Sequence, residues 1–377
     1  MKGYMIPGSF ARSILRKVPA LLLALVLLSA CQLFLGPDPE LSDENVLFNL
    51  WKDFNEMHAY VNMRMDTNKK FNSWKEVYAH YKKELNSGDI GLFDACGGML
   101  GELGDPHVNL YATGGNFSTF DTSPYVYKRN SSFYSEREEF SDIVRTYLKN
   151  GGAMSNDDIL LYGIFNAAPH IGYIYIPRFV DSQDPTGNRR WVDSIDTIVK
   201  FMQVNTSALI VDVRYNSGGI SQVAEYLASH FASTQINYLM ASVKSGPGYN
   251  EFSVPVISRV IPAKTNYTKP ITLITNRASF SAAEWFTLAM RTQNHVYHVG
   301  FPTSGALSIK STRPMINGWY YTISAHKVTD MNGKCYEVFG ISPYTEISGD
   351  EENRWIVHPG KQLESILDWF IQQLQEI

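Results

Sequence analysis

From residue 171 onward, apolar runs rich in β-branched residues alternate with stretches that have helical spacing. The runs are IGYIYI (171–176), SALIVDVRY (207–215), ITLIT (271–275) and VYHVG (296–300). Helical spacing follows the first three, for example at Val223, Ala224 and Leu227. This alternation predicts an α/β fold with a mostly parallel sheet, because each helix returns the chain to the same edge. Ligands in such folds bind where strands end and helices begin, so those turns are the first candidates for a functional site.

The chain before residue 171 has a different pattern. Apolar residues recur at three- and four-residue steps from Leu47 to Val61, and SWKEVYAHYKKEL and IGLFDACGGMLGEL predict two further helices. His58 lies in the first apolar stripe, and we expect a core histidine with satisfied hydrogen bonds rather than a ligand. We therefore expect a small helical N-terminal region over 41–107, a small mixed α/β linking segment over 108–170, and the α/β core with a C-terminal helix over 171–377.

The first thirty residues predict export. Several Lys and Arg residues precede an apolar stretch at 18–30 that is too short to span a bilayer but suits a signal peptide. The stretch ends in LLSAC, in which Leu28 to Cys31 resembles the bacterial lipobox; an ordinary cleaved signal is the alternative. We expect a signal peptide over 1–30, a tether over 31–40 and lipid on Cys31. This predicts a membrane-anchored lipoprotein in the periplasm or on the cell surface, with the outer membrane favoured.

The formal net charge of −4 comes without a long acidic or basic run, which argues against nucleic acid as a partner. Besides Cys31, the chain has Cys96 and Cys335, which could pair in an oxidising compartment or stay free. Neither has His or Cys at metal-ligand spacing. The sequence therefore predicts no metal site and leaves the pairing open.

Ser281 stands in NRASFSAAEWF, between the ITLIT run and a helical stretch. Ser281 to Glu284 has the form of a capping box, and taken alone that interpretation is favoured. A nucleophile at the same position would gain the field of the helix N-terminus, and the amide of Ala282 could face a developing oxyanion. Both interpretations predict the same local fold, so other segments must decide.

Two other turns could contribute to the same chemistry. Gly218 and Gly219 follow a buried strand in DVRYNSGG and could present a second oxyanion amide, although a Gly-Gly turn is often only a loop. His107, in LGDPHVNL, follows a helix break and could act as a general base. Asp212 and Arg214 are expected to be structural partners.

Five segments taken in order resemble the signatures of the C-terminal processing (tail-specific) serine protease family, which includes tricorn-core proteases and retinoid-binding interphotoreceptor repeats. They are IGYIYIPRF, LIVDVRYNSGG, NRASFSAAEWF, VGFPTSG and EVFGISPYTEI. The resemblance covers residues 95–110 and 170–348, roughly half of the chain. It implies a ClpP/crotonase-like core, a protein or peptide substrate, no cofactor, and Ser281 as the nucleophile.

The differences from this family pattern concern which residue acts as the general base. Ala306 stands where the Ser-Lys branch has its lysine, and we reject Lys310 as a substitute because four residues of strand span about 13 Å. The tricorn-like branch uses a serine–histidine pair oriented by a glutamate, which the resemblance assigns to His107 and Glu337. Glu346 is the rival for the second role. No PDZ domain is evident in 108–170.

These observations predict a serine endopeptidase with Ser281, His107 and Glu337 as its catalytic residues. The oxyanion would be held by Ala282 and by Gly218 or Gly219. The alternative is a catalytically silent protein that binds a peptide or an apolar ligand on the same scaffold. The physiological substrate, the oligomeric state and any need for an activating partner are not determined by the sequence.

Overall fold

The computed structural model describes residues 41–113, 115–118, 131–155, 159–180, 190–248, 250–346 and 359–375. The expected signal peptide, the tether and Cys31 lie outside these residues. Among the described helices, none combines the length and the apolar character needed to cross a bilayer.

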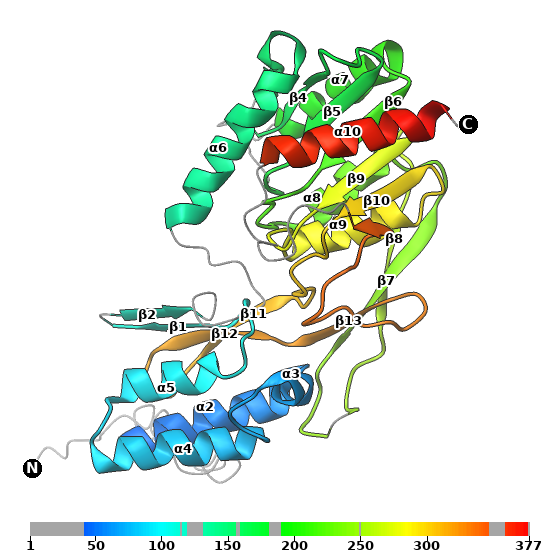
Figure 1. Ribbon diagram of the computed structural model, residues 1–377. Coiled ribbons are helices and arrows are strands. Elements are labelled where there is room, and N and C mark those ends of the chain that lie inside the picture. The colour runs from blue at the N-terminus through cyan, green and yellow to red at the C-terminus, as the bar shows by residue number, and fades with distance from the viewer. Residues whose placement is uncertain are drawn as a thin grey trace, which may run out of the picture.

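A seven-stranded sheet forms the centre of the larger part of the molecule (Figure 1). Its order is β14-β10-β9-β6-β5-β4-β3; the first five strands run parallel, and β4 and β3 pair antiparallel. The strands are β3 (Ala153–Met154), β4 (Leu161–Ile164), β5 (Ile171–Tyr175), β6 (Ala208–Asp212), β9 (Ile271–Thr275), β10 (Val296–Gly300) and β14 (Thr345–Glu346). The predicted α/β fold with a mostly parallel sheet is confirmed.

Helices cover both faces of this sheet, which is why β5, β6 and β9 are buried along their whole length. One face packs against α7 (Arg190–Asn205), α8 (Ser221–Ser229) and α9 (Ala282–Arg291). The other packs against α6 (Ser131–Tyr147) and α10 (Pro359–Gln375), which lie together in Figure 1, and the 3-10 turn η2 (Lys149–Gly151) follows α6.

The N-terminal helices pack against a second sheet. They are α2 (Asp43–Met57), α3 (Val61–Thr67), α4 (Trp74–Ser87) and α5 (Leu92–Gly101). The sheet has the order β11-β12-β1-β2, with β1 (Asn109–Ala112), β2 (Gly115–Ser118), β11 (Lys310–Pro314) and β12 (Tyr320–Ser324). Leu47 and Phe54 of α2 share an apolar core with Leu110, Tyr321 and Ile323 of the sheet. The helical N-terminal region is therefore half of a two-layer unit.

This pairing differs from the expected division of the chain. The segment 108–170 supplies β1 and β2 to one sheet and β3 and β4 to the other. Residues 310–324, from the expected core, return to the N-terminal helices. The physical reason is that the apolar faces of β1 and β12 need a cover, which α2 and α5 provide. Local sequence pattern does not specify which sheet a short strand joins.

A three-stranded antiparallel sheet links the two parts. Its order is β13-β7-β8, with β7 (Ile236–Val243), β8 (Val256–Val260) and β13 (His326–Asp330). In Figure 1, β7 runs from the seven-stranded sheet down toward the N-terminal helices. Only Ala325 separates β13 from β12, so the four-stranded sheet is tied directly to this link.

Candidate active site

Ser281 is held in an unusual backbone conformation at the start of α9. Its φ is 58° and its ψ is −116°, a region that non-glycine residues avoid on steric grounds. The Glu284 carboxylate accepts the Ser281 N–H at 3.1 Å and also the amides of Gly305 and Ala306 at 2.7 and 2.8 Å. Glu284 therefore supplies its half of the predicted capping box and fixes the turn that presents Ser281.

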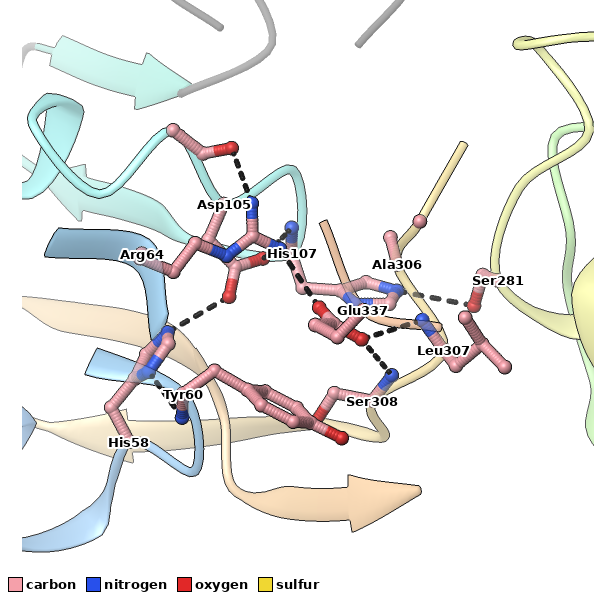
Figure 2. Close-up of polar contacts among 12 residues, drawn as sticks. His58, Tyr60, Arg64, Asp105, His107, Ser281, Ala306, Leu307, Ser308 and Glu337 are labelled. Carbon is pink, nitrogen blue, oxygen red and sulfur yellow. Dashed lines mark hydrogen bonds and ion pairs between the residues drawn. The ribbon is translucent and has the colours of Figure 1, made fainter. Parts of the chain in front are cut away.

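The Ser281 hydroxyl meets the predicted base. His107 Nε2 lies 3.1 Å from Ser281 Oγ, although 174 positions separate the two residues (Figure 2). The His107 ring packs beside Phe280, with 4.8 Å between ring centroids, and its side chain is almost fully buried. This distance is within the range required for a general base to take a serine proton.

The backbone on both sides of His107 is fixed by side chains. Its N–H donates to Asp105 Oδ1 at 2.9 Å, and its carbonyl accepts from Thr322 Oγ1 at 2.6 Å and from the Asn109 amide at 3.3 Å. Thr322 and Asn109 are paired neighbours on β12 and β1. The four-stranded sheet and the preceding turn therefore position the histidine.

Arg64 of α3 joins the helical region to this site. Its guanidinium contacts Glu337 Oε1 at 2.8 Å and Asp105 Oδ1 at 3.7 Å, and donates to the Gly104 carbonyl at 2.8 Å. All three charged side chains are buried. The sequence analysis did not identify Arg64 or Asp105. The available signal was that Arg64 shares one helical face with the buried Val61 and Met65.

Glu337 lies in the same buried cluster. Its Oε2 accepts the amides of Leu307 and Ser308 at 2.9 and 3.2 Å, while Oε1 is bound by Arg64 (Figure 2). Glu337 and His107 are thus linked through Arg64 and Asp105, and the direct orienting role of Glu337 stays a prediction. The rival Glu346 is exposed on β14, which forms one edge of the seven-stranded sheet.

Glu337 and Asp105 share the Arg64 guanidinium, but the pKa values of their carboxyl groups shift in opposite directions. Burial raises the pKa of Glu337 to about 8, and the nearby Asp105 and Glu284 add to this increase against the opposing effect of Arg64. Burial alone would also raise the pKa of Asp105, but Arg64 and a hydrogen bond from His58 hold it well below its usual range. Asp105 is therefore the ionised partner of the cluster.

The predicted oxyanion donors border Ser281. Gly218 donates its amide to Asn216 Oδ1 at 2.7 Å, so this N–H is occupied. Gly219 forms a parallel β-bridge with Phe179. The Phe179 N–H donates to the Gly218 carbonyl, and the Phe179 carbonyl accepts the Ile220 N–H. The N–H of Gly219 therefore points away from that strand. Within the described part of the chain, no acceptor is recorded for the amides of Gly219 and Ala282. The amides of Gly219 and Ala282 are therefore better candidates for the two oxyanion donors than the amide of Gly218.

Ser281 and His107 open into a cleft of about 350 Å³. Gly219 and Ala282 line it, as do Phe280, Trp285, Ile309, Lys310 and the serines Ser217, Ser221 and Ser308. Ala306 is fully buried and packs with Phe280. The nearest recorded base to the nucleophile is therefore His107.

The remaining candidates have structural roles. His58 is fully buried, with Nε2 2.8 Å from Asp105 Oδ2 and Nδ1 accepting the Tyr60 N–H. The buried pair Asp212 and Arg214 is joined at 2.6 Å.

Cys96 and Cys335 are free thiols. Among the described residues, no three His, Cys, Asp or Glu side chains are grouped to hold a metal ion.

Comparison with known proteins indicates a peptidase family. Residues 170–347 match the family described as peptidase family S41. The chain is 25% identical to carboxy-terminal processing protease CtpB of Bacillus subtilis (strain 168) over 173 residues, which span 46% of this chain and only 33% of CtpB.

Two solved structures resemble the whole described fold. A protein of Parabacteroides merdae ATCC 43184, named as a candidate peptidase, has 26% identity and a TM-score of 0.68 over 88% of this chain and 97% of its own. Mature CPAF in complex with lactacystin has 12% identity and a TM-score of 0.66 over 90% of this chain and 100% of its own, and so shares the fold. This chain therefore contains a peptidase family S41 domain over residues 170–347.

Proposed function

We propose that this chain is a serine endopeptidase that hydrolyses peptide bonds of protein or peptide substrates through an acyl-enzyme at Ser281. The observation that carries the proposal is the 3.1 Å contact between His107 Nε2 and Ser281 Oγ, which opens into a cleft bordered by the amides of Gly219 and Ala282. The peptidase family S41 match and the similarity to CtpB support the same reaction class.

The geometry accounts for each step of the reaction. Ser281 Oγ attacks the carbonyl carbon while His107 Nε2 takes its proton, and the oxyanion is held by the two amides. The imidazolium then gives this proton to the leaving amine as the carbon–nitrogen bond breaks. Water attacks the resulting ester while His107 takes one of its protons. His107 then returns this proton to Ser281 Oγ as the acyl carbon–oxygen bond breaks, which releases the new carboxylic acid.

Glu337 and Arg64 support the histidine in this scheme. In its ionised form, which Arg64 favours, the buried Glu337 carboxyl stabilises the imidazolium as it forms, and Arg64 keeps the Glu337 and Asp105 carboxyl groups in place. We assign Glu337, rather than Glu346, to this role because Glu337 is buried in the cluster that holds the backbone of His107.

We also propose that lipid on Cys31 anchors the enzyme to a membrane, with the catalytic part exported. The proposal rests on the charged, apolar and LLSAC segments in order at the N-terminus. Labelling of the full chain with radioactive palmitate, in the wild type and in Cys31→Ala, tests it. Incorporation that persists in Cys31→Ala would contradict the assignment.

A fluorophosphonate probe and casein cleavage test the catalytic proposal. We expect the probe to label the wild type and the variant Ser221→Ala, whose serine lines the same cleft, but not Ser281→Ala. Casein cleavage should follow the same pattern. Labelling that persists in Ser281→Ala would remove Ser281 from the mechanism.

The alternative, a silent binding protein, predicts a different set of results. Such a protein would show neither labelling nor casein cleavage, and it would bind a peptide or an apolar ligand with equal affinity in the wild type and in Ser281→Ala.

A further inference from the structure

Lys310 gives the cleft a charge that the proposed mechanism does not use. It lines the same 350 Å³ cleft as Ser281 and His107, at the first position of β11. The other residues that line this cleft are apolar, hydroxyl-bearing or glycine, apart from the titratable His107. Among the described residues that line the cleft, Lys310 therefore supplies the cationic side chain apart from His107.

This lysine differs from the two buried arginines Arg64 and Arg214. Arg64 and Arg214 are each ion-paired with a carboxylate at 2.8 and 2.6 Å. For Lys310, no ion pair or side-chain hydrogen bond is recorded with any described residue, and its side chain is exposed. A cation on a concave wall without an anionic partner attracts anionic groups and favours their entry.

The position of Lys310 is fixed relative to the catalytic cluster. Ser308, two residues earlier, donates its amide to Glu337 and its hydroxyl to the His326 carbonyl at 2.8 Å. Lys310 pairs with Ser324, whereas the next pair, Ser311 and Ile323, lies on the face that packs against the N-terminal helices. Since side chains alternate along a strand, Lys310 points to the face away from those helices.

β11 also offers backbone groups to an extended peptide. It is an edge strand of the four-stranded sheet, and its side away from β12 has no strand partner in the described part of the chain. Four of its five residues are exposed, and the strand ends at Pro314. A substrate that enters the cleft could pair with this edge as an added strand, which would hold its side chains at fixed intervals beside Lys310.

We propose that the cleft selects peptides that carry a carboxylate close to the bond to be cleaved, and that Lys310 binds this carboxylate. The inference rests on the proposed peptidase function. The carboxylate comes either from an Asp or Glu side chain or from the free C-terminus of the substrate.

Matched fluorogenic peptides test the inference at low salt. One pair differs only by Glu or Gln beside the scissile bond, and a second pair differs only by a C-terminal acid or amide. We expect wild-type kcat/KM to be about two- to fivefold higher for the carboxylate member of at least one pair. This ratio should fall to about one in Lys310→Met and below one in Lys310→Glu, and it should shrink as salt rises. The exposed Lys200 of α7 provides the control, Lys200→Met, which should keep the wild-type ratio.

Binding of the same peptides to Ser281→Ala, measured by fluorescence anisotropy, gives a readout that needs no turnover. Equal affinity within both pairs, or a preference that Lys310→Met leaves unchanged, would overturn the inference. Fluorophosphonate labelling of Ser281 and casein cleavage in the same wild-type preparation would leave the peptidase proposal intact in that case. If the wild type shows neither labelling nor casein cleavage, the peptidase proposal fails. Lys310 would still be supported as the selecting residue if the binding assay shows a carboxylate preference and Lys310→Met abolishes it.

Discussion

Replacing Arg64 with methionine tests whether the buried charge cluster holds the two parts of the site together. The change keeps most of the apolar stem but removes the contacts to Glu337, Asp105 and the Gly104 carbonyl. Glu337 and Asp105 are fully buried and would lose their shared cation. Removing one partner of a buried ion pair costs about 3–5 kcal/mol. This is a large part of the total stability of a typical domain.

Urea unfolding followed by circular dichroism measures the loss. With a slope of about 3 kcal/mol/M, a loss of about 4 kcal/mol lowers the midpoint by about 1.3 M. Arg64→Lys should recover part of it, because it restores the charge but not the forked geometry. Arg64→Met combined with Glu337→Gln should also recover part. Arg259→Met, at an exposed position on β8, is the control and should change stability by less than about 0.5 kcal/mol.

The sign of the pH dependence sharpens this test. Burial already raises the pKa of Glu337, and loss of Arg64 removes the main effect that lowers it. The folded variant then holds a proton that the unfolded chain releases at lower pH, so its stability falls as pH rises. Wild-type Glu337, with a pKa of about 8, causes the same decline up to about pH 8, so the deficit of Arg64→Met should be larger at pH 9 than at pH 6. A deficit below about 1 kcal/mol, or one equal at both pH values, would refute this account.

Three further changes have defined outcomes. Ser281→Ala and His107→Ala should each lower kcat by about 10³-fold or more, and the double variant should be no worse than either single one, because the two groups act as a unit; additive losses in peptide kinetics would argue against a pair. Gly219→Ala should fail to fold or lose at least about 2 kcal/mol in urea unfolding, because its φ is 136° and the new Cβ would overlap a backbone carbonyl oxygen; wild-type stability would contradict that geometry. Burial raises the pKa of Glu284 to about 7. Ionisation of Glu284 should therefore lower the free energy of unfolding by up to about 3 kcal/mol as pH rises from the pKa of this group in the unfolded chain through 7. Glu284→Gln should make the slope in urea unfolding between pH 5 and 8 shallower and leave the share of Glu337, and a slope equal to that of the wild type would assign it to another group.

The parts of the fold with a strong local pattern could be predicted from the sequence. The runs at β5, β6 and β9 are buried on both faces, so their apolar character carries a clear strand signal. The contact between Ser281 and His107 agrees with the pairing that the family resemblance implied, since local pattern marked each residue only as a candidate. Local pattern could not predict that β11 and β12 leave the core for the N-terminal helices, since this depends on which apolar faces lack a cover.

Arg64 and Asp105 escaped the sequence analysis for a different reason. Arg64 and Glu337 are 273 positions apart, and neither sits in a local motif that specifies a partner. The position of Arg64 on an apolar helix face indicated that it is buried, and a buried arginine needs carboxylates. Sequence alone could not say which of the 37 acidic residues provide them.

The backbone of Ser281 implies that this chain gives up some stability to hold its reactive hydroxyl. A serine at φ 58° is sterically strained, whereas glycine is not. The variant Ser281→Gly should therefore have a higher melting temperature than the wild type, although it lacks the hydroxyl. Selection for the most durable fold would place glycine there. A strained serine at this position is what we expect of a residue whose hydroxyl acts on other molecules.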